Sequence, residues 1–208
     1  MRDLDKVLDD IIAIRSQIAR SAEFRGYGPA TVATTGVLAM LGAVVQAVWI
    51  PYPADAVASY LALWVTTAAI SVILIGIQMV ARSRRIHMGL ADEMIHAATA
   101  DFAPAAVAGA LLTVVLFWFA PQSLWMLPGL WQIVFSLGFL ASCHSLPRPM
   151  FAVGVWYLAT GLCNLALASE AIAFSPWAMA LPFGIGQLVM AAILYGSVST
   201  SDVESQRQ

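Results

Sequence analysis

The chain has 208 residues, of which 61% are hydrophobic and only 11% charged, and its formal net charge is -2. So few charged residues cannot give a soluble protein of this length a polar surface. The composition therefore excludes a soluble globular domain and indicates that lipid surrounds most of the chain. The small net charge favours neither a nucleic-acid partner nor long-range electrostatic steering.

Residues 1–25 predict an amphipathic helix that precedes the membrane part. Between residues 3 and 22, apolar side chains recur at alternating spacings of three and four residues, and charged residues lie opposite them. The stripe consists of Leu4, Val7, Ile11, Ile14 and Ile18. Acidic residues such as Asp3 and Asp9 would be repelled by an anionic lipid surface. We therefore expect the stripe to contact protein, either the chain's own cytoplasmic hairpin, a second copy or another protein.

Six long segments without Asp, Glu, Lys or Arg predict six transmembrane helices. At ~1.5 Å per residue, each is about long enough to cross ~30 Å of hydrocarbon. The segments are 29–50, 57–80, 102–120, 124–145, 150–169 and 177–197. We expect an all-α integral membrane protein whose spans form three consecutive hairpins within residues 26–197. A polar tail, residues 198–208, follows.

The positions of the positive charges predict the orientation of the chain. All ten Lys and Arg residues lie before the first predicted span or after the second, fourth and sixth. By the positive-inside tendency, both termini are cytoplasmic, and we expect a multi-pass protein of a bacterial inner membrane. Tryptophans at the opposite boundary predict an interfacial aromatic belt: Trp49, Trp118, Trp125 and Trp177.

The second and third predicted hairpins share a sequence pattern. Leu127-Pro128 followed by Gln132 resembles Leu181-Pro182 followed by Gln187, with a spacing that differs by one residue. Three consecutive hairpins in a chain of this length resemble the layout of the HdeD-type acid-resistance membrane proteins. The resemblance is one of layout alone and assigns no role to any residue.

Pairs of small residues four positions apart predict faces of close helix packing. These pairs are Ala39 with Ala43, Ala105 with Gly109, and Ala192 with Gly196.

Candidate metal ligands gather on the predicted cytoplasmic side. They are His87, Glu93, His96, Cys143 and His144. Glu93 and His96 are three residues apart in a predicted helical hairpin at about 82–101, a spacing used by carboxylate–histidine metal sites. Only one such pair exists, so solvated histidines are the favoured interpretation and a metal or redox site is the weaker alternative. Cys143 and Cys163 are predicted at different depths, which disfavours a disulfide.

Catalytic patterns are not visible in the sequence, which lacks a metalloprotease motif and a glycine-rich phosphate loop. An enzyme is therefore disfavoured, and we expect no cofactor. The span cores contain no Asp, Glu, Lys, Arg or His, which disfavours proton-coupled transport but is compatible with uncharged cargo.

Amide side chains are the main polar groups of the predicted spans. Gln46, Gln132, Asn164 and Gln187 fall at roughly 6 to 15 Å from the outer boundary, and Gln78 lies nearer the cytoplasm. If the first four point inward, they line a polar pocket together with Trp131 and Thr66. Alternatively, each amide bonds a neighbouring helix, a contact worth about 0.6 to 2 kcal/mol.

Three functional hypotheses follow. The leading one is a non-enzymatic interaction, assembly or stress-response module whose cytoplasmic helix and hairpin engage a protein partner or a second copy. The alternative is a channel, carrier or binding protein for a small uncharged or apolar molecule. The third is a metal or redox site on the cytoplasmic face.

Overall fold

The computed structural model describes residues 28–86, 91–142, 149–167 and 170–205. The predicted amphipathic helix, including Leu4, Val7, Ile11, Ile14 and Ile18, lies outside these residues. Every regular element in the described part is a helix, and six of the helices are long and apolar enough to cross a membrane. This confirms the predicted all-helical class and is consistent with an integral multi-pass membrane protein.

The elements follow one another with short connections. In chain order they are α2 (Pro29–Trp49), α3 (Val57–Ile86), α4 (Ala91–Phe119), η1 (Pro121–Met126), α5 (Leu127–Ala141), α6 (Met150–Leu167), α7 (Glu170–Ala173) and α8 (Pro176–Ser205). Pro29 and Pro176 are the first residues of their helices, where a missing N–H breaks no intrahelical bond.

The fourth span differs from its predicted bounds. The sequence predicts a continuous segment at 124–145, whereas the apolar span runs from Pro121 to Ala141 and begins with the 3-10 helix η1. Pro121 opens η1 and Pro128 lies in the first turn of α5, so each proline is found where its lack of an N–H is tolerated.

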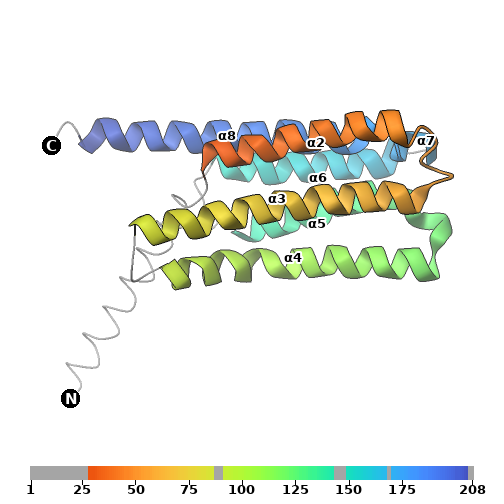
Figure 1. Ribbon diagram of the computed structural model, residues 1–208, viewed down its shortest axis with the longest axis horizontal. Coiled ribbons are helices and arrows are strands. Elements are labelled where there is room, and N and C mark those ends of the chain that lie inside the picture. The colour runs from red at the N-terminus through yellow and green to blue at the C-terminus, as the bar shows by residue number, and fades with distance from the viewer. Residues whose placement is uncertain (1–27, 87–90, 143–148, 168–169, 206–208) are drawn as a thin grey trace, which may run out of the picture.

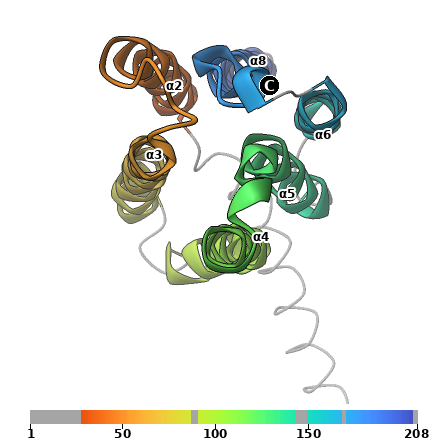
Figure 2. The ribbon, with the colours of Figure 1, turned by 90° about the vertical axis from the view of Figure 1, so that its right-hand side faces the viewer.

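The six long helices form a closed ring. Successive long helices run antiparallel (Figure 1). Seen from the end of the bundle, they follow one another around the ring in the order α2, α3, α4, α5, α6 and α8 (Figure 2). Each helix contacts the next, and α8 contacts α2. We call the end where α2 finishes and α8 starts the belt end, and the opposite end, where α3 finishes and α4 starts, the extension end.

Glycines set the two closest helix contacts, which join α2 to α8 and α5 to α6. A methyl group added at Gly36 would lie 3.2 Å from the carbonyl oxygen of Gly184. At Gly161 it would lie 2.8 Å from the carbonyl oxygen of Gly129. Backbones that approach this closely exclude side chains, so the hairpins are joined to one another through glycine.

The predicted small-residue pairs differ in their surroundings. Ala39 and Ala43 are buried, and Ala105 packs on α5, where a methyl group at Gly138 would lie 2.7 Å from its Cβ. Ala192 is exposed, and a methyl group at Gly196 would meet nothing within 4 Å. The third pair therefore does not mark a packed face within this bundle.

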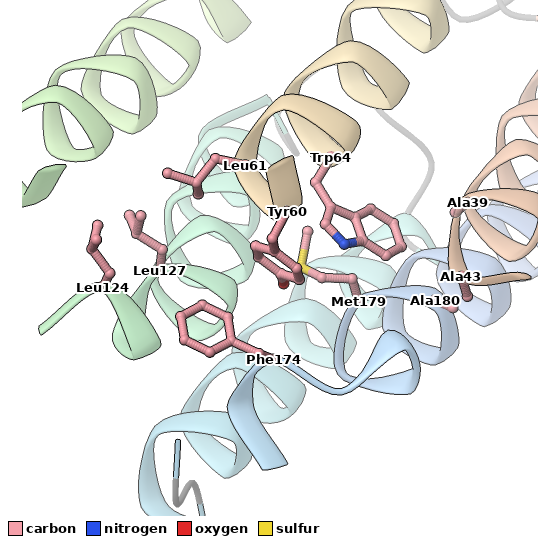
Figure 3. Packing of buried hydrophobic residues seen from close by; sticks show 10 residues of the cluster. All are labelled: Ala39, Ala43, Tyr60, Leu61, Trp64, Leu124, Leu127, Phe174, Met179 and Ala180. Atoms are coloured by element: carbon pink, nitrogen blue, oxygen red, sulfur yellow. The ribbon is translucent and has the colours of Figure 1, made fainter. Parts of the chain in front are cut away.

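Two apolar clusters fill the ring, one toward each end. The belt-side core is shown in Figure 3, where Tyr60 and Phe174 meet edge to face at 5.0 Å. Its buried members are Ala39, Ala43, Tyr60, Leu61, Trp64, Leu124, Leu127, Phe174, Met179 and Ala180. The extension-side core consists of Val32, Phe139, Met150, Val153, Tyr157, Met190, Ala191 and Leu194. Side chains from several helices meet in each cluster, so packing holds the ring closed at two levels.

The predicted aromatic belt is only partly exposed. Trp49, Trp118 and Trp177 are 81%, 73% and 55% exposed, as an interfacial position requires. Trp125 is instead half-buried against the belt-side core, because it belongs to η1, which folds over the end of the ring.

The glycine contact between α5 and α6 should control stability. We expect Gly161→Ala to lower the free energy of unfolding by about 1–3 kcal/mol, because the added methyl group meets a backbone carbonyl. Gly76→Ala is the matched control, because a methyl group there meets nothing within 4 Å and alanine is the better helix former. Detergent unfolding measures both variants, and equal effects would contradict the proposed contact.

Candidate functional site

Amide side chains from four of the six long helices lie inside the ring. Gln46, Gln132 and Gln187 are buried, and Asn164 is half-buried. The structure joins two of these four amides at a single backbone atom. Gln132 Nε2 and Asn164 Nδ2 donate to the carbonyl oxygen of Ala178, at 2.9 and 3.0 Å.

Pro182 explains why that carbonyl is available. In a regular helix, the carbonyl of Ala178 would accept the N–H of the residue four positions later, which here is Pro182. Proline has no N–H, so it leaves an unpaired acceptor within the apolar span. Gln132 of α5 and Asn164 of α6 replace the missing donor, which joins both helices to α8. Trp156 strengthens the same junction by donating from Nε1 to the Pro182 carbonyl at 3.0 Å.

Gln46 forms a second clamp within the belt-side half of the bundle. Its Nε2 donates to the carbonyl oxygen of Phe174 at 2.6 Å, and its Oε1 accepts from Trp64 Nε1 at 2.8 Å. This one side chain connects α2 to α3 and to the turn before α8. Its amide is fully buried, so loss of either bond would leave a polar group in an apolar environment.

The other predicted pocket residues lie elsewhere. Trp131 Nε1 donates to Thr113 Oγ1 at 2.9 Å, which joins α5 to α4, and Thr66 is exposed on α3. Gln187 faces α2, where its Cβ lies 3.1 Å from the position of a methyl group at Gly36. Gln78 Oε1 accepts from the Gly28 N–H at 3.3 Å and joins α3 to the start of α2.

The predicted metal ligands are mostly outside the described residues. This applies to His87, Cys143 and His144, while Glu93 and His96 belong to the first turns of α4. Among the residues that the structure describes, no group of three or more His, Cys, Asp or Glu side chains gathers in a way that could hold a metal ion.

A small cavity opens at the belt end of the ring. Its volume is about 90 Å³, and its lining includes Val57, Gln122, Trp125 and Phe174. The walls come from the start of α3, from η1 and from the turn before α8. The belt-side core lies beneath this cavity, since Phe174 belongs to both.

Sequence reasoning identified the amides but not their partners. It did not single out Trp64, Trp156 or the Ala178 carbonyl, which complete the two clamps. One signal was present, because an intrahelical proline always frees the carbonyl four residues earlier. The chemistry of the described polar groups is interhelical hydrogen bonding, in which amide and indole N–H groups are donors and backbone carbonyls are the main acceptors.

Pro182 and Gln132 should therefore be energetically coupled. We expect Gln132→Leu to destabilise the protein by about 1–2 kcal/mol, because the Ala178 carbonyl then keeps only the Asn164 donor. In a Pro182→Ala background the cost should be smaller, because the restored N–H bonds the same carbonyl. A double-mutant cycle of unfolding free energies measures the coupling, and purely additive effects would reject this account.

Comparisons with known proteins do not assign the chain to a family. No protein-family model matches it, and neither the curated proteins nor the solved structures contain a significant match. Sequence and structure agree on an all-helical protein with six long apolar helices, consistent with an integral multi-pass membrane protein.

Proposed function

We propose that this chain is a non-enzymatic multi-pass membrane protein that acts as an interaction, assembly or stress-response module. Its predicted cytoplasmic end engages a protein partner or a second copy. The observation that carries the proposal is an asymmetry between the two ends of the bundle. Three helices continue into charged residues at the extension end, past the spans that the sequence predicts, whereas helices and predicted spans finish together at the belt end.

The extensions are substantial. α3 continues past its predicted span, 57–80, to Ile86, and α8 continues past its predicted span, 177–197, to Ser205. α4 begins at Ala91, although its predicted span begins only at position 102, after Asp101, which adds ~16 Å of helix at ~1.5 Å per residue. At the belt end, by contrast, the helices start or stop with their spans at Val57, Phe119 and Pro176.

The extensions also carry much of the charge of the chain. Their residues include Arg82, Arg84 and Arg85 in α3 and Asp92, Glu93 and Asp101 in α4. Charged helices beyond a hydrocarbon layer suit contacts with protein or with aqueous solutes rather than with lipid. Because α2 also starts at the extension end, the chain that carries the predicted stripe of Leu4, Val7, Ile11, Ile14 and Ile18 enters the bundle there.

The alternative function, transport or binding of a small uncharged molecule, has less support. The amide N–H groups of Gln46, Gln132 and Asn164 are bonded to backbone carbonyls of neighbouring segments. These donors serve helix association, which is the second of the two interpretations that the sequence allows. A bundle clamped in this way suits a scaffold that holds its extensions in fixed positions.

Polar substitutions in the stripe should separate association from folding. We expect Ile11→Asn with Ile14→Asn to reduce cross-linking and co-purification from native membranes by about tenfold, which corresponds to ~1.4 kcal/mol of lost contact. The matched control is Asp5→Asn with Asp9→Asn on the predicted opposite face, which should keep the partner.

Two further measurements, the thermal unfolding midpoint and the absorption spectrum, complete this experiment. The thermal unfolding midpoint of the stripe variant should equal that of the unaltered chain, so that loss of the partner is not caused by loss of the bundle. Association that persists in the stripe variant would refute the proposal. An absorption band of a bound metal or cofactor in the purified protein would favour the third hypothesis instead.

A further inference from the structure

Buried oxygen atoms without hydrogen-bond partners gather at the junction of α5, α6 and α8. Among the described residues, these atoms are Gln132 Oε1, Ser136 Oγ, Tyr157 Oη and Gln187 Oε1. The exposed fractions of the four side chains are 0%, 0%, 1% and 8%. Tyr60 Oη has the same status but belongs to the belt-side core. Four such atoms at one junction call for a physical explanation.

Backbone geometry brings the four side chains together. Gln132 and Ser136 are one turn apart on α5, and the Gln132 Cβ lies 3.1 Å from the position of a methyl group at Gly161 of α6. Tyr157 is one turn before Gly161 on the same face of α6. Its ring reaches α8, because a methyl group at Gly186 would lie 2.5 Å from Tyr157 Oη. Gln187 follows in the chain, and although its Cβ packs against Gly36 of α2, its amide lies close enough to the Tyr157 hydroxyl to interact with it. The Tyr157 and Gln187 oxygens nevertheless make no hydrogen bond of regular geometry.

Aromatic rings close this junction. One ring from each helix takes part: Phe135 of α5, Tyr157 of α6 and Phe183 of α8. The ring centroids are 4.7 Å apart for Phe135 and Tyr157, 5.2 Å for Tyr157 and Phe183, and 5.5 Å for Phe135 and Phe183. The polar atoms are therefore separated from lipid and from bulk solvent by packed side chains.

Ser136 differs from other hydroxyl-bearing residues of the spans. The hydroxyls of Thr67, Ser71 and Thr113 each donate to the carbonyl four residues earlier in their own helix, at 2.7 to 2.8 Å. The Ser136 hydroxyl makes no such bond, although the same acceptor position exists in α5. A hydroxyl that forgoes this local bond is free to bind a group inside the junction.

We propose that this junction is a buried water-binding site. Amide oxygens only accept hydrogen bonds, whereas hydroxyls both donate and accept, so the four groups together require an occupant that can do both. Water supplies two donors to Gln132 and Gln187 and accepts from Ser136 and Tyr157. A cation would lack a balancing carboxylate, and an apolar molecule would leave every oxygen unpaired, at a cost of several kcal/mol in hydrocarbon.

Water contact at Tyr157 can be measured directly in the full chain. With ring-labelled tyrosine in lipid nanodiscs, solid-state NMR should record rapid polarisation transfer from water to Tyr157, whose signal is assigned by its loss in Tyr157→Phe. We expect Ser136→Ala to slow this transfer severalfold, because one ligand of the water is lost. Ser71→Ala is the matched control and should leave the transfer unchanged, since its hydroxyl bonds its own helix.

The sign of a stability change gives a second, independent reading. Tyr157→Phe keeps the ring contacts and removes one bonded hydroxyl, so the thermal midpoint should fall by about 2–4 °C. Tyr195→Phe, at an exposed tyrosine of α8, should leave it unchanged. Absent transfer with an unchanged or higher midpoint would show a dry junction. Absent transfer with a lower midpoint would show direct pairing of the side chains, and transfer unaffected by Ser136→Ala would place the water elsewhere. Each of these results would overturn the proposal.

Discussion

Hydrocarbon offers no hydrogen-bond partners, so each backbone carbonyl and N–H group inside the spans must be paired within the protein. Continuous helices meet this requirement, and a proline interrupts it. Pro104 lies near the start of its span, so the carbonyl that it frees, at position 100, falls outside the apolar segment. Pro182 lies six residues after the start of α8, so the freed carbonyl of Ala178 is inside. Gln132 and Asn164 donate to this carbonyl in place of the missing N–H, and the two bonds determine where α5 and α6 meet α8.

Packing within the ring is uneven. Some helices are in close contact, whereas others are only loosely packed, which fits a scaffold that carries extensions. The closest contacts join different hairpins, through Gly36 with Gly184 and through Gly129 with Gly161. By comparison, no residue of Phe102–Phe119 in α4 is buried, so this part of α4 presents most of its surface to the outside of the bundle. The tightly packed helices form the scaffold. α3 and α4 lie at the edge of that scaffold and carry charged extensions beyond it.

The polar residues of the spans show how one sequence pattern supports two interpretations. Amides at a shared depth are compatible with a ligand pocket and with helix clamps, because both place them inside a bundle. Here Gln46, Gln132 and Asn164 donate to backbone carbonyls, and only their surroundings in space make this evident. What remains unpaired is a set of oxygens at the α5, α6 and α8 junction, and the water site that we infer there would complete the same network of interhelical bonds.

The sequence alone determined the helical class and the number and approximate limits of the apolar helices. Hydrocarbon thickness sets the length of a span, charged residues are excluded from it, and prolines such as Pro29 and Pro176 mark helix starts. Only the tertiary structure decided which helices are neighbours, that Trp125 packs inward and that Ala192 does not pack. In a soluble protein the apolar face of a helix marks its buried side. In a membrane, lipid is as apolar as the core, so the sequence pattern of a span does not distinguish the two, and close packing and hydrogen bonding decide between them.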